Sequence, residues 1–319
     1  MKYNVSSTII ASSLAFMSLS LEAAGFRQLT IKESGQPDLA VGLWYPSEQT
    51  PPTEPNTRFG LSVALDAPIS STNGGLILIS HGYGGWYAGH ADTAAALADA
   101  GFMVAAPTHS GNTWSDMSSP IEKWALDRPR HMSAVLDHIL SDAELQTHVD
   151  SQKVGVYGFS AGGFTALGLI GGVPDLNYAQ QHCQQQPEEF VCTEGMIEQM
   201  RAANMHSLPD SAWGFDSRVK AASISAPGLG FTYTESTLAR VSADVQLWSG
   251  QLDESVPTQS NAASIAAKLP SGAETHWIDK ANHFAFMVVN CREAFKENDP
   301  EEYEVVCGDA KGFDRHQFH

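Results

Sequence analysis

Residues 153–163 read KVGVYGFSAGG, and they carry the strongest structural signal in the chain. A short apolar strand leads into Ser160, and a helix rich in Ala and Gly begins directly after it. The pattern Gly-x-Ser-x-Gly between a strand and a helix is typical of a sharp, strained turn that lifts a serine hydroxyl above a parallel sheet. The chain crowds against itself at such a turn, which explains glycine at both Gly158 and Gly162. We therefore expect Ser160 to be a nucleophile.

The rest of the chain alternates between strands and helices. Strands are expected over residues 29–31, 40–45, 75–80, 102–107, 153–158, 219–224, 245–249 and 274–278, and helices over 90–100, 128–141, 161–170 and 259–268. This alternation predicts one α/β domain over residues 24–319, with a mainly parallel central sheet and helices on both faces. The polar, Gln-rich residues 174–216 break the alternation. They are interpreted as a lid or cap insertion, or as a plain surface excursion.

A serine hydroxyl needs a base, and two later segments supply candidates. Asp253 follows the apolar strand VQLW, and His283 follows the strand THWIDK. Both therefore lie at carboxyl ends of strands, where open parallel sheets place their active sites. In the order Ser160, Asp253, His283, the histidine would shuttle the proton and the aspartate would orient it. Glu254 is the alternative carboxylate, although the position directly after Gly-x-x favours Asp253.

Oxyanion stabilisation is expected from a second loop. Residues 80–85 read SHGYGG and follow the apolar strand GLILIS. Glycines allow this backbone to approach a substrate closely, so the N–H groups of Tyr83 and Ala161 are assigned to an oxyanion hole. His81 precedes the hole, and we expect it to make structural hydrogen bonds.

Large aromatic side chains lie near the expected site in sequence, and part of them will be core residues. The candidates for an apolar substrate pocket are Trp86, Tyr87, Trp114, Trp213 and Phe231. No Arg-rich loop accompanies them, so a phosphate or carboxylate substrate is not favoured. Small to medium neutral acyl esters are the expected substrates, and lactones or polyester oligomers are alternatives.

Composition excludes several other classes of protein. The 319 residues carry a net charge of −18, which repels phosphate backbones and anionic lipid and argues against nucleic-acid partners. No apolar run of 18 or more residues follows the N-terminus, so no membrane span is expected. The cysteines form no Cys-x-x-Cys pair and lie near no spaced histidine, so neither a metal nor a cofactor is expected.

The N-terminus predicts export. Residues 1–23 carry a lysine at position 2, continue with an apolar stretch and end with small residues, as signal peptides do. A periplasmic or secreted location is oxidising, so the even number of cysteines predicts disulfides. The simplest of three connectivities is local, and it pairs Cys183 with Cys192 and Cys291 with Cys307.

At these residues the chain resembles the α/β-hydrolase superfamily. More narrowly, it is similar to the bacterial predicted dienelactone hydrolases and the related platelet-activating-factor acetylhydrolases. Besides the Ser160 turn, the matching segments are 25–29 (GFRQL), 43–46 (LWYP), 80–85 (SHGYGG), 107–113 (PTHSGNT), 308–309 (GD) and 312–315 (GFDR). The resemblance implies a serine esterase. True dienelactone hydrolases use a cysteine nucleophile, so Ser160 favours ester hydrolysis over dienelactone activity.

The resemblance also concerns the C-terminus. Relatives continue past a segment like residues 312–319 into a helix that packs on the sheet. If such a segment were missing here, an apolar face of the sheet would be exposed.

The main hypothesis is an exported serine carboxylesterase that works through an acyl-enzyme on a small-molecule ester. A serine peptidase on the same fold is an alternative, for which the acidic pair Glu188 and Glu189 would bind a charged peptide terminus. A binding protein that kept the fold without catalysis is a third reading.

Overall fold

The computed structural model describes residues 23–33, 35–287, 291 and 293–319, so the predicted signal peptide lies almost entirely outside the described residues. The strands are β1 Ala23–Ile31, β2 Leu39–Ser47, β3 Ala64–Leu65, β4 Leu76–Ser80, β5 Met103–Pro107, β6 Val154–Phe159, β7 Val219–Ser225, β8 Asp244–Gly250 and β9 Glu274–Ile278. The helices are α1 Ala91–Asp99, α2 Ile121–Ser141, α3 Ala161–Leu169, α4 Leu176–Gln185, α5 Phe190–Thr193, α6 Met196–Ala202, α7 Glu235–Leu238, α8 Ala262–Ala266, α9 Glu293–Asn298, α10 Pro300–Cys307 and α11 Arg315–Phe318.

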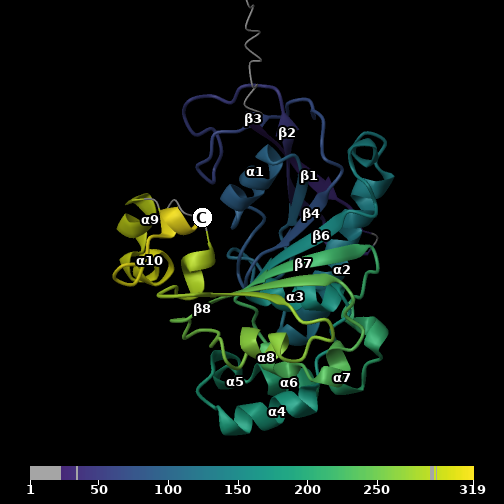
Figure 1. The fold of residues 1–319 in the computed structure, drawn as a ribbon, viewed down its shortest axis with the longest axis vertical. Helices are drawn as coiled ribbons and strands as arrows, with labels where there is room; N and C mark the ends of the chain where they lie inside the picture. Colours follow the sequence, from purple (N-terminus) through teal and green to yellow (C-terminus); the bar gives the residue numbers. More distant parts are fainter. Residues whose placement is uncertain (1–22, 34, 288–290, 292) are drawn as a thin grey trace, which may run out of the picture.

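All nine strands join one sheet, in the order β3-β1-β2-β5-β4-β6-β7-β8-β9. The pairings β1–β2 and β2–β5 are antiparallel, and every pairing from β5 to β9 is parallel. The predicted mainly parallel α/β sheet is therefore confirmed (Figure 1). Because parallel strands all end at one edge, the loops after β4, β6, β8 and β9 meet there.

Helix α2 is the main difference from the expected elements. It begins at Ile121 and runs through Pro129, whereas the predicted helix started at residue 128. Proline in a helix interior removes one backbone hydrogen bond. The helix continues because its buried face extends upstream over Ile121, Trp124 and Ala125. Burial of such side chains contributes about 1.5–3 kcal/mol for each large one, which offsets the lost bond.

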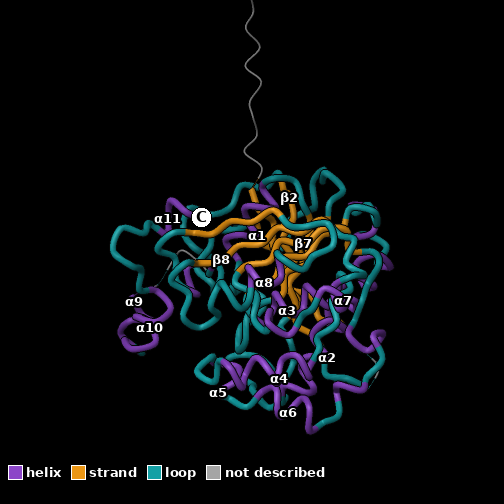
Figure 2. Tube along the Cα trace, turned by 60° about the horizontal axis from the view of Figure 1, so that its bottom comes forward, coloured by secondary structure: helices purple, strands orange, loops and turns teal. Residues whose placement is uncertain are grey.

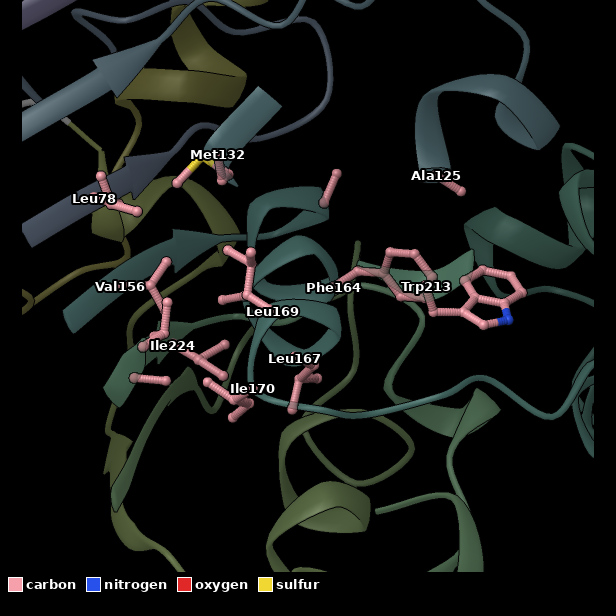
Figure 3. Close-up of a cluster of buried hydrophobic side chains, with 14 of the residues drawn as sticks. Leu78, Ala125, Met132, Val156, Phe164, Leu167, Leu169, Ile170, Trp213 and Ile224 are labelled. Atoms are coloured by element: carbon pink, nitrogen blue, oxygen red, sulfur yellow. The ribbon is translucent and has the colours of Figure 1, made fainter. Parts of the chain in front are cut away.

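Two apolar layers hold the sheet. On one face, α2 and α3 pack against β4, β6 and β7, and Figure 3 shows this core around Met132, Leu169 and Ile224. On the other face, the alanines of α1 pack against Trp44 and Val104. The expectation of helices on both faces is thus confirmed, and β6, which carries Ser160 at its end, is buried between the layers.

Residues 174–216 form their own small group of helices. Helices α4, α5 and α6 lie side by side, outside the α3 face of the sheet (Figures 1 and 2). Leu176, Ala179, Ile197 and Met200 are buried on the inner side of this group. The polar residues that marked the stretch therefore belong to its outer side, and the group is anchored to the main core by apolar contacts.

Two disulfides brace the structure, and both follow the local pairing. Cys183–Cys192 links α4 to α5, and Cys291–Cys307 closes the segment that contains α9 and α10. On the α1 side of the sheet, strands β6–β8 and helix α11 line an apolar hollow of about 420 Å³, beside Tyr157, Trp248 and Phe318. In the described part of the chain, no helix has the length and apolar character needed to cross a membrane.

Candidate active site

Ser160 occupies a strained turn at the end of β6. Its backbone has φ 55° and ψ −117°, a region that residues other than glycine rarely adopt. Two backbone hydrogen bonds stabilise this strained conformation. The Ser160 N–H donates to the Ser225 carbonyl over 3.0 Å, and the Gly228 N–H donates to the Ser160 carbonyl over 3.0 Å. The turn is therefore fixed by the end of β7 and the loop after it.

The two glycines of the motif are required by close backbone contacts. A Cβ on Gly158 would lie 2.2 Å from the Gly162 carbonyl oxygen. A Cβ on Gly162 would lie 1.9 Å from the Ser80 carbonyl oxygen. Neither backbone atom can move aside cheaply, since both belong to packed elements. The crowding expected from the motif is present, and it presses α3 against the end of β4.

Three side chains from separate loops meet above the sheet. His283 Nε2 lies 3.1 Å from Ser160 Oγ, and His283 Nδ1 lies 2.7 Å from Asp253 Oδ2. The other Asp253 oxygen accepts a 2.7 Å hydrogen bond from the Val256 N–H, and the residue is only 5% exposed. Glu254 is exposed and makes none of these contacts, so Asp253 is the carboxylate that reaches the histidine.

The loop after β4 packs directly on Ser160. A Cβ on Gly82 would lie 3.5 Å from the Ser160 Cβ, which shows how closely this backbone approaches the nucleophile. Ala161 is the first residue of α3, so its N–H has no helical partner, and the positive end of the helix dipole points at Ser160. The loop and the helix start therefore flank the serine hydroxyl from two sides.

A buried histidine cluster supports this loop from behind. His81 Nδ1 lies 2.7 Å from the Gly82 carbonyl oxygen, and His81 Nε2 accepts a 3.1 Å hydrogen bond from the His109 N–H. The His109 Nε2 in turn lies 2.9 Å from Ser80 Oγ. Burial, together with the nearby Arg128 charge, lowers the pKa of His81 and of His109 well below the ordinary value. Neutral His81 thus makes the structural hydrogen bonds expected of it.

A mostly apolar cavity of about 260 Å³ opens beside Ser160 and His283. Its aromatic and aliphatic walls are Tyr83, Trp86, Phe159, Phe190, Val256, Phe284 and Met287. His90 also lines it, and burial lowers the pKa of His90 to about 4, so this ring is neutral near pH 7. Of the five side chains predicted to line a substrate pocket, only Trp86 lines this cavity.

The other four predicted pocket residues lie elsewhere. Trp213 is buried in the core, edge-on to Phe164 (Figure 3). Phe231 is buried and stacks on His182 with ring centroids 4.2 Å apart. Trp114 is 73% exposed at a loop tip.

Tyr87 is the fourth, and it packs against Phe26 and Trp44. In each of these four cases the backbone path decides where the ring goes, and proximity in sequence to a motif did not show it.

Several wall residues were missed. Phe284 directly follows His283, and Val256 lies three residues after Asp253, so adjacency to the candidate residues was an available signal for both. Phe190 had no such signal, because it reaches the cavity from the insertion over residues 174–216. Glu188 and Glu189, the acidic pair considered for binding a peptide terminus, have different surroundings. Glu189 bonds to His182 over 3.0 Å, whereas Glu188 is exposed.

The described residues contain no group of three or more His, Cys, Asp or Glu side chains arranged to hold a metal ion. The side chains that the structure brings together here are a hydroxyl, an imidazole and a carboxylate, those of Ser160, His283 and Asp253.

Comparisons with known proteins agree with this fold. Residues 63–190 match the model of the Dienelactone hydrolase family. Among solved structures, the chain is similar to a ferulic acid esterase from Streptomyces cinnamoneus, with a TM-score of 0.55 and 18% identity over 91% of this chain and 84% of that chain. A comparison with curated proteins found no match. The chain therefore has the α/β-hydrolase fold, and the family match over residues 63–190 supports a hydrolase that acts on carboxylic esters.

Proposed function

We propose that the protein is an exported serine carboxylesterase that hydrolyses small to medium neutral acyl esters through an acyl-enzyme intermediate. The observation that carries this proposal is the continuous pair of hydrogen bonds from Ser160 through His283 to Asp253, 3.1 Å and 2.7 Å long. A nucleophile, a base and an orienting carboxylate in this order are what acyl transfer needs.

In the proposed reaction, Ser160 Oγ attacks the ester carbonyl carbon while His283 Nε2 takes the hydroxyl proton. His283 then donates this proton to the leaving alkoxide oxygen as the C–O bond breaks, which releases the alcohol and leaves an acyl-serine. Water attacks the acyl-serine with His283 again as base, and the carboxylic acid leaves. Asp253 holds Nδ1 protonated, so that Nε2 faces Ser160 as a base, and it stabilises the imidazolium.

The N–H groups of Tyr83 and Ala161 are proposed to stabilise the negative charge that develops on the carbonyl oxygen. This assignment is supported by the positions of the loop after β4 and the start of α3, which lie on either side of Ser160. Donors arranged before reaction avoid the cost of reorienting water, and one such donor contributes about 10²–10³ in turnover.

The cavity supports a neutral, apolar acyl or alcohol group. Among the residues that the structure describes, no lysine or arginine side chain lines it, and its aromatic walls suit flat or aliphatic groups. Aromatic acyl esters are a second candidate substrate class, because Tyr83, Trp86 and Phe284 offer ring faces and the similar solved structure is a ferulic acid esterase.

Export and a lid role for residues 174–216 are parts of the same proposal. The two disulfides and the signal-like residues 1–23 support passage to an oxidising compartment. Phe190 forms one wall of the cavity, and the Cys183–Cys192 bridge flanks it. This wall is proposed to cover bound substrate.

The test is hydrolysis of a p-nitrophenyl ester series from acetate to dodecanoate, with methyl ferulate added, by the protein and its Ser160→Ala variant. We expect cleavage that depends on Ser160 and falls by several orders of magnitude in the variant. Full activity of Ser160→Ala would overturn the assignment. Cleavage of aminoacyl anilides in place of esters would favour the peptidase alternative.

A further inference from the structure

We propose that Arg128 is a positioning residue for the oxyanion hole, holding the backbone of residues 81–83 so that the Tyr83 N–H faces the substrate. This inference rests on the proposed function. It concerns a side chain on α2, outside the group of Ser160, Asp253 and His283, and it assigns a role to a buried charge that the fold leaves without a counterion.

Arg128 is fully buried on the inner face of α2. Its Nη2 donates hydrogen bonds to the carbonyl oxygens of His81 and Gly82, the latter over 3.4 Å. Its Nε and Nη1 have no hydrogen-bond partner in the described part of the chain. Burial lowers its pKa to about 9, still above neutral, so the guanidinium carries its charge near pH 7. The hydrogen bonds that Arg128 makes are thus directed at the loop beside Ser160.

No carboxylate among the described residues forms an ion pair with Arg128. By contrast, the guanidinium of Arg315, which is nearly as buried, pairs with Asp309 over 2.8 Å, and Arg218 pairs with Asp216 over 2.6 Å. A buried charge without a counterion costs stability. Apart from the Trp124 ring, whose centroid lies 5.7 Å from Cζ, the contacts that offset this cost are the hydrogen bonds to the loop beside Ser160.

Peptide geometry links the arginine to the proposed oxyanion donor. The described residues contain no cis peptide bond, so the carbonyl of Gly82 and the N–H of Tyr83 lie in one plane and point in opposite directions. Arg128 holds that carbonyl toward the interior of the protein. The Tyr83 N–H is therefore directed away from Arg128, and Gly82 itself lies against Ser160.

The same carbonyl accepts from two further donors. His81 Nδ1 lies 2.7 Å from the Gly82 oxygen, and its other ring nitrogen is occupied as an acceptor, so Nδ1 carries the proton. The Gly85 N–H donates to the same oxygen over 3.2 Å. Several donors on one carbonyl polarise the peptide and strengthen its N–H as a donor. The positive charge of Arg128 behind the loop also favours negative charge in front of it, in surroundings of low dielectric constant. Both effects grow as the oxyanion forms, so they act on the transition state more than on bound substrate.

The test compares Arg128→Met, Arg128→Lys and the matched control Lys123→Met, which removes an exposed cation from the same helix. Each is assayed for kcat and KM on p-nitrophenyl acetate, for inhibition by a trifluoromethyl ketone that forms a tetrahedral oxyanion on serine, and for its melting temperature. Arg128→Met should lower kcat about 10- to 100-fold with KM nearly unchanged, and it should weaken inhibition by the ketone by a similar factor. Arg128→Lys should recover part of the loss, and Lys123→Met should behave as the unaltered protein.

Melting temperature separates positioning from mere structural support. Removing an uncompensated buried charge should leave the melting temperature of Arg128→Met unchanged or raise it, while activity falls. Unaltered kcat in a folded Arg128→Met, or a loss that appears in KM and leaves ketone inhibition unchanged, would overturn the inference. If Arg128→Met does not fold, Arg128→Lys decides: a folded lysine variant with full kcat and full ketone affinity overturns the inference. The proposed function fails separately, when Ser160→Ala keeps its activity.

Discussion

His283 Nδ1 lies 2.7 Å from Asp253 Oδ2, although the two residues are 30 positions apart in the chain. Asp253 stands in the loop after β8, His283 in the turn after β9, and these strands are parallel neighbours in the sheet. Parallel pairing brings their carboxyl ends to one edge. The hydrogen bond is therefore a direct consequence of sheet order, and the Asp253 carboxylate that accepts it is buried.

The first prediction concerns this pair. Asp253→Asn should lower kcat about 10⁴-fold, because an amide favours the wrong imidazole tautomer and does not stabilise the imidazolium. The matched control is Glu254→Gln, which alters the exposed neighbour and should leave kcat unchanged. Steady-state hydrolysis of p-nitrophenyl acetate measures both. A larger loss of kcat in Glu254→Gln than in Asp253→Asn would mean that Glu254 is the functional carboxylate.

The second prediction concerns crowding at the Ser160 turn. Gly162→Ala places a Cβ 1.9 Å from the Ser80 carbonyl oxygen and should cost about 3 kcal/mol or more of the free energy of unfolding. Gly35→Ala is the control, since a Cβ there meets nothing within 4 Å. Its positive φ should cost only about 1 kcal/mol. Urea unfolding measures both, and equal losses would contradict the close contact.

The third prediction concerns stability at acidic pH. Burial lowers the pKa of His131 to about 3 and of His90 to about 4, whereas an unfolded histidine titrates near 6.5. The folded protein therefore binds fewer protons than the unfolded chain below about pH 6.5, and its stability should fall as the pH falls from there toward 4.

Unfolding in urea between about pH 8 and pH 5 measures this slope. His131→Asn should reduce it by close to one proton, whereas His206→Asn, at an exposed position, should leave it unchanged. A flat stability profile over this range would show that the buried histidines do not resist protonation.

The fourth prediction concerns the wall contributed by the insertion. Phe190→Ala should lower kcat/KM about three- to tenfold for long or aromatic acyl esters, since it removes apolar contact area, and should affect the acetate little. Phe215→Ala is the control, because Phe215 is also a half-exposed phenylalanine but packs on Arg240 away from the cavity. The same loss across all acyl lengths would argue that Phe190 acts on folding and has no part in substrate binding.

Local pattern predicted the elements near the site well. The strand before Ser160 and the helix after it came from an apolar run and a Gly-x-Ser-x-Gly turn, and the structure has both. The start of α2 was missed because Pro129 is a local signal for a helix start, whereas burial of the upstream face extends the helix. Strand β3 was missed because two residues carry no periodicity.

Sequence patterns were enough to identify the chemistry available to this protein: a serine between crowding glycines, and the order of Ser160, Asp253 and His283. These features depend on neighbouring residues or on the order of strands along the chain, and both can be recognised in the sequence. Tertiary packing sets the rest: which of three connectivities the cysteines adopt, which aromatic rings line the cavity, that Phe190 reaches it from the insertion, and that Arg128 lies behind the loop at Gly82. Such contacts join segments far apart in sequence, and their geometry is set by how helices and loops pack on the sheet.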